Sequence, residues 1–272
     1  MADEISRYNR ERWEELAAAN VRYSRPALNL DPESAKDMVD PEGIMGRCQG
    51  RDVLLLAGGG GQQSAAFSLL GAKVTVADFS PAQLARDQLA AEHYGRDVRL
   101  VETDMRDLSM FGAEEFDIVY HAHSINFIPD PGQAFREVAR VLRQGGLYYL
   151  TCTNPFTHGI WETDWDGNGY PLHDTYADGQ VDCGETWDVD DEDGEVVAQI
   201  RGPREFRHTM GTLINELTTR GFVLLALWED SEGNPNATPG TWDHFKTVAA
   251  PWLRFWFRYN PRGFLSRQPG PA

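Results

Sequence analysis

The sequence is poor in cysteine. Its 272 residues include only Cys48, Cys152 and Cys183, which lie far apart and show neither the paired spacing of metal ligands nor that of a redox disulfide. We therefore expect free thiols in a reducing compartment, the cytoplasm. No metal site is predicted from this spacing.

Basic residues are scarce relative to acidic ones. Lys and Arg number 25 against 42 Asp and Glu, so the formal net charge is -17. This charge repels nucleic acids and anionic membranes at long range, which leaves a small molecule as the expected partner. The acidic segment from Asp188 to Glu195 is interpreted as a solvated hairpin.

Long hydrophobic runs are missing as well. No apolar stretch approaches the length of a membrane span, and Met1–Arg7 lacks the apolar core of a signal peptide. Hydrophobic residues still make up 41% of the chain, which is enough for a large core. We expect a soluble protein, monomeric or homodimeric.

A regular alternation of strands and helices occupies the first half of the chain. The expected strands are 52–56, 73–77, 98–101, 116–121 and 147–151, and the expected helices are 63–70, 81–94 and one that opens at Pro131. Short linkers and nearly continuous apolar strands are typical of a parallel sheet that is buried on both faces. The pattern predicts a doubly wound α/β fold.

Four consecutive glycines, Gly58 to Gly61, follow the first strand directly and precede a helix of small residues. Glycine lets a ligand approach the bare backbone, and a helix N-terminus favours negative charge. Asp78 ends the next strand, at the roughly 20-residue spacing that places a carboxylate beside a ribose. The segment predicts a pocket for a nucleoside-bearing cofactor.

The remaining organisation is less regular. Residues 1–50 are interpreted as a helical lid segment, with a helix over Ile5–Asn20 that is followed by an extended segment over Val21–Pro26. Residues 51–260 form the expected catalytic domain, and 154–203, rich in Trp, Asp, Gly and Tyr, is its cap insertion. A helix over 206–220, closing strands over 222–228 and 252–259, and a tail over 261–272 complete the prediction.

The motifs in this order resemble the class I S-adenosylmethionine-dependent methyltransferases. Gly59 and Gly61 match the family's glycine motif, whereas Ala57 replaces its first glycine and Leu55 replaces the usual acid. The segment from Phe135 to Leu147 is similar to the family's helix, turn and fifth strand. The resemblance implies a mostly parallel, seven-stranded, Rossmann-like sheet with a C-terminal antiparallel hairpin and an inserted substrate cap.

The same resemblance implies S-adenosylmethionine as cofactor, S-adenosylhomocysteine as product and an oxygen, nitrogen or sulfur atom of a small molecule as acceptor. Asp78 is then expected to bind the ribose hydroxyls, and Asp104 the adenine amino group. The full predicted cofactor set is Tyr23, Ala57, Gly58, Gly59, Gly60, Gly61, Gln62, Gln63, Asp78, Phe79, Asp104, Met105, His121 and Ala122.

Two other functions stay open at this point. Gly59, Gly61 and Ser64 loosely mimic a dinucleotide-binding motif, and Asp78 suits a NAD ribose, so an NAD(P)-dependent oxidoreductase is one alternative. A non-catalytic cofactor-binding protein is the other, because the acid replaced by Leu55 is lost.

Candidates for catalysis and substrate binding come from residue type and position. His123 follows the fourth strand and His208 opens the helix after the insertion, so either is a candidate general base. Aromatic side chains in a polar insertion favour a substrate pocket wall, or else anchor the insertion. The predicted substrate residues are Phe156, Trp161, Trp165 and Tyr170.

Overall fold

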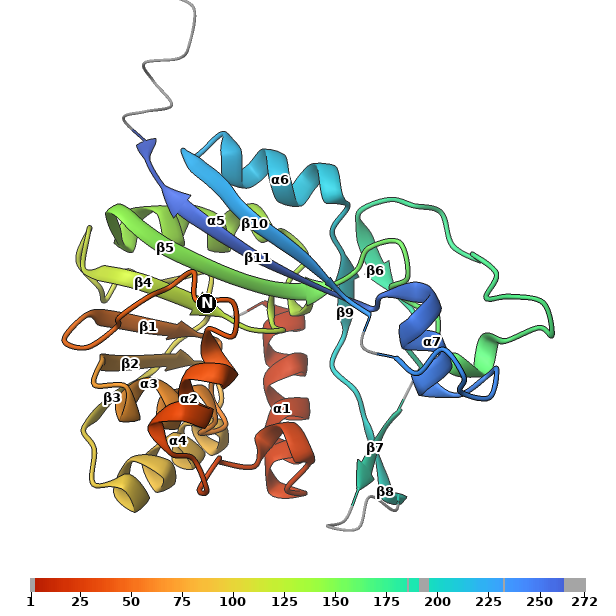
Figure 1. Ribbon diagram of the computed structural model, residues 1–272, viewed down its shortest axis with the longest axis horizontal. Coiled ribbons are helices and arrows are strands. Elements are labelled where there is room, and N and C mark those ends of the chain that lie inside the picture. Colours follow the sequence, from red (N-terminus) through yellow and green to blue (C-terminus); the bar gives the residue numbers. More distant parts are fainter. Residues whose placement is uncertain (1–2, 185, 191–195, 232, 262–272) are drawn as a thin grey trace, which may run out of the picture.

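A seven-stranded sheet forms the centre of the computed structural model, which describes residues 3–184, 186–190, 196–231 and 233–261. The strand order is β10-β11-β5-β4-β1-β2-β3. β1, β2, β3, β4 and β5 run parallel, whereas β11 is antiparallel to both β5 and β10. The predicted Rossmann-like sheet with an antiparallel C-terminal hairpin is confirmed (Figure 1). The strands are β1 (Asp52–Leu56), β2 (Lys73–Asp78), β3 (Val98–Glu102), β4 (Phe116–His121), β5 (Leu142–Thr153), β10 (Phe222–Asp230) and β11 (Trp252–Tyr259).

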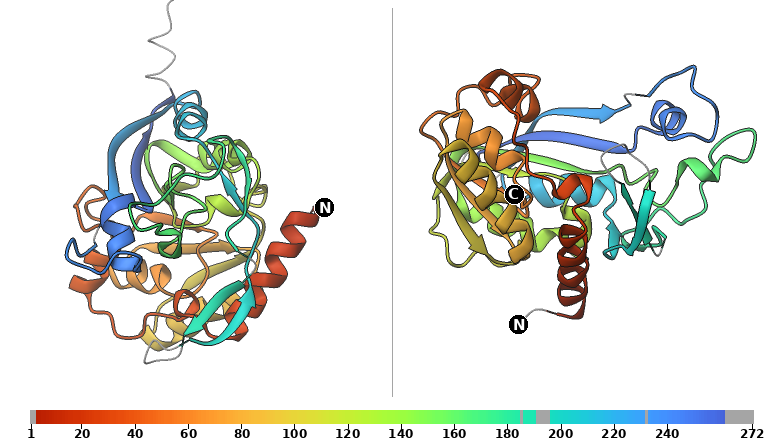
Figure 2. Two further views of the ribbon diagram at one scale, coloured as in Figure 1. Left: turned by 90° about the vertical axis from the view of Figure 1, so that its right-hand side faces the viewer. Right: turned by 90° about the horizontal axis from the view of Figure 1, so that it is seen from below.

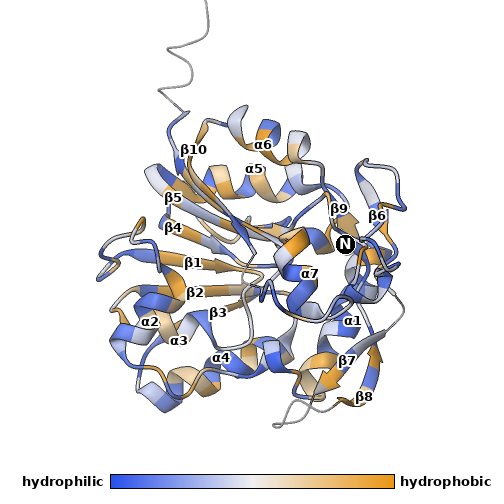
Figure 3. Ribbon diagram, turned by 45° about the vertical axis from the view of Figure 1, so that its right-hand side comes forward, coloured by the Kyte–Doolittle hydropathy of each residue, from blue (hydrophilic) through white to orange (hydrophobic). Residues whose placement is uncertain are grey.

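Helices cover both faces of this sheet. One hydrophobic cluster joins the strands to α5 and α6 through Phe135, Val138 and Leu213, and another joins them to α2 and α3 through Val39 and Phe67. The hydrophobic strands β1 and β2 lie between these layers (Figure 3). The helices are α2 (Pro32–Val39), α3 (Gln63–Leu69), α4 (Pro81–Tyr94), α5 (Pro131–Val141) and α6 (Met210–Thr218).

The N-terminal helix α1 (Glu4–Ala18) is fastened to the domain by its side chains. Asn9 is buried and bonds the carbonyls of Phe127 and Arg204, and it also accepts from the Arg204 N–H. Glu14 accepts from the Ser80 hydroxyl at 2.6 Å. The short 3₁₀ helix η1 (Arg22–Ser24) follows where an extended segment was predicted.

The cap insertion lies beyond the carboxyl ends of the parallel strands (Figures 1 and 2). It contains η3 (Glu162–Asp164), β6 (Gly179–Val181), β7 (Thr186–Asp190) and β8 (Val196–Arg201). β7 and β8 form an antiparallel pair, which confirms the predicted hairpin, while its turn at 191–195 lies outside the described residues. β6 pairs instead with β9 (Glu205–Arg207), which follows the insertion.

The structure differs from the local predictions at three further places. The helix predicted from Phe206 begins at Met210, because 205–207 pairs with β6 and Thr209 caps the helix by accepting from the Thr212 N–H. α2 occupies a segment predicted as a loop, and α7 (Trp242–Ala249) was not predicted. The predicted tail lies almost entirely outside the described residues. Within the described part of the chain, no helix combines the length and hydrophobicity that crossing a bilayer requires.

Candidate active site

A cavity of about 1090 Å³ opens at the carboxyl ends of the strands, where ligands bind in open α/β sheets. Its walls come from α1, the segment after it, the glycine loop, the ends of β2, β4 and β5, the cap and α7. Of the predicted site residues, those that line it are Tyr23, Ala57, Gly58, Gly59, Gln62, Gln63, Asp78, Phe79, Asp104, Met105, Ala122, His123 and Trp161.

The glycine loop approaches the Asp78 carboxylate closely. A Cβ added to Gly59 would lie 2.6 Å from Gln83 Cβ and 3.0 Å from Asp78 Oδ2, so this position excludes a side chain. Ala57, which stands where the family has glycine, adopts a left-handed φ of 45°. Gly58 and Gly59 present bare backbone to the cavity, which fits the close approach of a cofactor.

Gly60 and Gly61 do not line the cavity, because their N–H groups bond a carboxylate behind the loop. Asp87, fully buried on α4, accepts from both amides at 3.1 Å and from the Ser64 hydroxyl at 2.5 Å. Burial, together with the charge of Asp78, raises the pKa of Asp87 to about 7 despite the hydrogen bonds from Ser64, Gly60 and Gly61, which lower it. The N–H groups of these two glycines are therefore occupied by Asp87, and their predicted contact with the cofactor stays a prediction.

Asp78 lies at the end of β2 with both oxygens aimed at backbone donors. Oδ2 accepts from Gly59 N at 3.0 Å and Oδ1 from Ser80 N at 2.9 Å. Burial nevertheless raises the pKa of Asp78 to about 6. Its remaining lone pairs are suited to accept from ribose hydroxyls.

Asp104 is held by neighbouring side chains. Arg106 donates to both of its carboxylate oxygens, and the Ser6 hydroxyl of α1 donates to Oδ2 at 2.7 Å. Burial raises the pKa of Asp104, but the hydrogen bonds from Arg106 and Ser6 outweigh it and hold the pKa below its ordinary value. Arg106 also pairs with Asp3 at 2.7 Å, so this network ties α1 to the predicted adenine end of the cavity.

Aromatic rings and Gln62 close the cavity on the lid side. The Trp13 ring packs edge-on against Tyr23, Phe127 and Trp187 at centroid distances of 5.3 to 6.0 Å. Gln62 donates from Nε2 to the carbonyls of Tyr23 and Arg25, each at 2.8 Å. The predicted lid segment therefore contacts the glycine loop directly.

The two strand-end histidines differ in accessibility. His121 is buried, its Nδ1 pairs with the Tyr148 hydroxyl at 2.8 Å, and burial lowers its pKa to about 3. It does not line the cavity, unlike Ala122 and His123 beside it. His123 has a φ of 50° and is exposed to the cavity, whose walls still remove it from bulk water and lower its pKa to about 4.

His208 does not line the cavity. Its side chain is buried, and its Nε2 pairs with the Ile125 carbonyl at 3.1 Å. It precedes the Thr209 cap of α6 rather than opening the helix. This environment favours a structural histidine over a general base.

Of the predicted substrate residues, only Trp161 lines the cavity. Phe156 is 56% exposed and stacks on Tyr176 at the edge of a second hollow of about 210 Å³. Trp165 and Tyr170 contact the His244 ring, which anchors the cap to α7. His158, a weaker candidate base than His123 and His208, also lines the cavity. Residues that were not predicted complete the far wall: Thr157, Cys183, Glu205, Asp230, Trp242, Phe245 and Trp252.

The fold and this cavity define the class of protein: an open α/β enzyme whose nucleoside-cofactor pocket lies at the carboxyl ends of its strands. A methyltransferase-domain family model matches residues 54–150. The chain is 30% identical over 188 residues to the uncharacterized methyltransferase YbaJ of Bacillus subtilis, which covers 68% of this chain and 71% of that protein. The chain belongs to the class I S-adenosylmethionine-dependent methyltransferases, and S-adenosylmethionine is its cofactor.

Two further comparisons either cover only about half of the similar protein or show the fold alone. The C-methyltransferase UbiE of ubiquinone and menaquinone biosynthesis from Hahella chejuensis is 35% identical over 133 residues, 46% of this chain and about half (52%) of that protein. The crystal structure of an S-adenosylmethionine-dependent methyltransferase from Mesorhizobium loti superposes with a TM-score of 0.59 at 20% identity, over 85% of this chain and 100% of that one.

Proposed function

We propose that the chain transfers a methyl group to an oxygen, nitrogen or sulfur atom of a small molecule held in the cavity beside the cofactor. The observation that carries this proposal is the size and division of the cavity. Pockets for one drug-sized ligand measure roughly 300–1,000 Å³, and the cavity of about 1090 Å³ has room beyond one ligand. Its lining includes the carboxylates of Asp78 and Asp104, which we assign to a polar end, and the rings of Trp161, Trp242 and Trp252 from the cap, α7 and β11, which we assign to an aromatic end.

The cofactor is assigned to the polar end. Asp78 would accept from the ribose hydroxyls, and Phe79, Asp104 and Met105 would surround the adenine, while Gly58 and Gly59 leave space for the methionine part. Tyr23, Gln62 and Gln63 border the same end. When bound, S-adenosylmethionine supplies an electrophilic methyl group on a sulfonium sulfur.

The acceptor is assigned to the aromatic end. His123 projects into the cavity after β4, and its lowered pKa keeps the imidazole neutral at pH 7, so it can accept a proton. The walls position the acceptor atom and exclude water from it. Asp230 lies near His123 and favours the imidazolium that proton transfer creates.

Relatives do not select the acceptor atom. The printed names of three of them specify a carbon-directed methyltransferase, an N-terminal methyltransferase of cypemycin and an O-methyltransferase of ubiquinone biosynthesis. The net charge of -17 supports a small-molecule acceptor over nucleic acid. Cys48, Cys152 and Cys183 carry no disulfide, which supports the further proposal of a reducing, cytoplasmic location.

The test uses the whole chain with methyl-labelled S-adenosylmethionine and a cell extract separated into small molecules, protein and nucleic acid. Label in the small-molecule fraction, with stoichiometric S-adenosylhomocysteine, is expected. Label confined to protein or nucleic acid, or no product at all, would refute the proposal. His123→Ala should lower kcat, whereas His93→Ala, an exposed imidazole on α4 outside the cavity, should not.

A further inference from the structure

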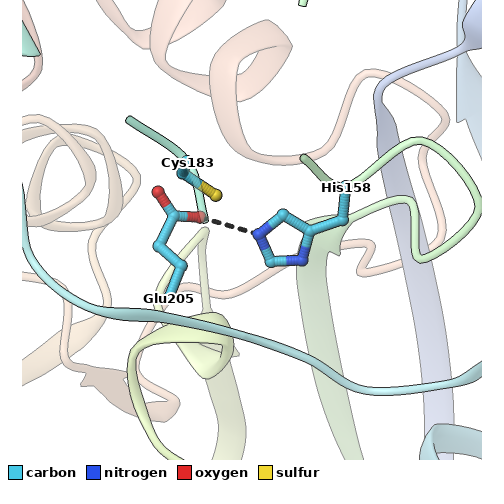
Figure 4. Close-up of side chains that lie close together, drawn as sticks. All are labelled: His158, Cys183 and Glu205. Atoms are coloured by element: carbon cyan, nitrogen blue, oxygen red, sulfur yellow. Dashed lines mark hydrogen bonds and ion pairs between the residues drawn. The ribbon is translucent and has the colours of Figure 1, made fainter. Parts of the chain in front are cut away.

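Three side chains of metal-ligand type meet in the cavity wall, apart from the residues assigned to the cofactor. His158 follows β5, Cys183 lies between β6 and β7, and Glu205 opens β9. One ligand atom of each lies within 4.8 Å of the other two. Figure 4 shows the three side chains pointing toward one another.

The surrounding backbone fixes this arrangement. β6 pairs with β9, which places Cys183 beside Glu205. Arg207, also in β9, donates from Nη2 to the His158 carbonyl at 2.6 Å, and the His158 N–H donates to the Asn154 carbonyl at 2.9 Å. The segments that carry the three side chains are therefore connected by hydrogen bonds, although they are distant in sequence.

We propose that His158, Cys183 and Glu205 bind one Zn²⁺ ion whose fourth coordination position opens into the cavity. Sulfur, imidazole nitrogen and carboxylate oxygen are the ligands that zinc takes, and three protein ligands with one open position are typical of its reactive sites. All three residues line the cavity, so the open position faces a bound molecule.

The distances are compatible with zinc after small side-chain movements. Zinc–ligand bond lengths place the ligands of a tetrahedral ion roughly 3.3–3.8 Å apart. His158 Nε2 lies 3.0 Å from Glu205 Oε2, and the whole set spans no more than 4.8 Å. A Cys183 thiolate and the Glu205 carboxylate together balance the charge of the ion, and Asp182 adds a further acidic group next to Cys183.

A hydrogen-bonded proton relay is the competing interpretation of the same cluster. In a His–Glu relay, Nε2 bonds the carboxylate and Nδ1 must reach the substrate. His158 Nδ1 is fully buried and has no partner among the described residues. Only Nε2 of His158 faces Glu205 and Cys183, and Nδ1 cannot reach a substrate. This arrangement favours an ion shared by the three side chains over a proton relay.

The test measures metal binding by the untagged chain after bound metals have been removed and with its cysteines kept reduced. It does not require the methyl acceptor to be known. Zn²⁺ is titrated in competition with a chromophoric chelator, and Co²⁺ reports sulfur ligation through its thiolate charge-transfer band. We expect one ion per chain with the thiolate band. Cys183→Ser should remove the band, and His158→Gln and Glu205→Gln should each weaken Zn²⁺ binding at least tenfold.

Cys48→Ser, which alters a buried thiol elsewhere, is the matched control and should leave binding unchanged. Retained stabilisation by S-adenosylhomocysteine shows that each variant still folds. The inference is overturned if Zn²⁺ does not bind, or if the band and the affinity survive Cys183→Ser. A failure of methyl transfer with intact zinc binding would refute the proposed function alone.

Discussion

Asp78 should make cofactor affinity depend on pH in a way that asparagine cannot reproduce. The ionised carboxylate accepts from ribose hydroxyls, whereas the protonated form loses that capacity at one oxygen. Because burial raises the pKa of the free protein's Asp78 to about 6, binding must displace a proton below that pH. Affinity should therefore fall about tenfold per pH unit below 6 and level off above 7.

The Asp78→Asn variant should also bind the cofactor more weakly at neutral pH. Hydrogen bonds to a charged group are worth about 1.5–3 kcal/mol, which corresponds to a dissociation constant roughly 10- to 150-fold higher at neutral pH. The variant should also lose the pH dependence, since no carboxyl remains to titrate at this position.

Calorimetric titration with S-adenosylhomocysteine between about pH 5 and pH 8 measures both effects. His121 and His123, with pKa values of about 3 and 4, stay neutral over this range, whereas Asp87, with a pKa of about 7, changes its protonation state within it. Asp87→Asn is the control and should keep the wild-type slope below pH 6. A flat wild-type profile, or an equal slope in Asp78→Asn, would refute the reasoning.

Three further predictions concern stability, each measured by urea unfolding. The folded pKa of Asp87 is raised from 3.8 to about 7, so the native state holds an extra proton between these pH values. The contribution of Asp87 to the free energy of unfolding should therefore fall by up to ~4 kcal/mol as pH rises from about 4 to 7. Asp87→Asn should show a smaller fall than the wild type, and an identical fall would contradict this. Ala57→Gly relieves about 1–2 kcal/mol of left-handed strain against about 0.4–1 kcal/mol of chain entropy, so it should leave stability unchanged or raise it by up to ~1.6 kcal/mol, whereas Ala57→Val should clearly destabilise. Asn9→Leu leaves three partly buried backbone groups without their side-chain partner, and a loss of at least ~2 kcal/mol with faster hydrogen exchange in α1 is expected; unchanged exchange would show that α1 is held by other contacts.

The parallel core could be predicted because each of its elements carries a strong local signal. Lys73–Asp78 is a buried apolar strand, and Pro81–Tyr94 begins with a serine cap and a proline and ends at a left-handed glycine. The carboxyl ends of such strands share one edge, which is why Asp78 was expected beside the glycine loop, whereas Asp104 was expected from the family resemblance. Both line the cavity.

Other features depend on tertiary contacts that no local pattern reports. The helices α2 and α7 are too short to be stable without packing, although each begins with a local cap, Asp31 before Pro32 in α2 and Thr241 in α7. Asp87 lies in mid-helix, and nothing in its spacing indicates that it bonds the glycine loop. Aromatic residues such as Phe156 and Trp165 satisfied the composition expected of a substrate wall, but composition does not distinguish a cavity-facing ring from an anchoring one.

The segment that matches the methyltransferase-domain model ends at residue 150, yet the aromatic end of the cavity, at Trp161, Trp242 and Trp252, is built from residues beyond that point. On the proposed function, the methyl donor is bound mainly by the matched segment and the acceptor mainly by the residues that follow it. Substitutions at Trp161, Trp242 or Trp252 are then expected to change which molecule is methylated while S-adenosylhomocysteine binding is retained. Membership of the family would thus predict the reaction, and the segments outside the matched domain would determine the acceptor.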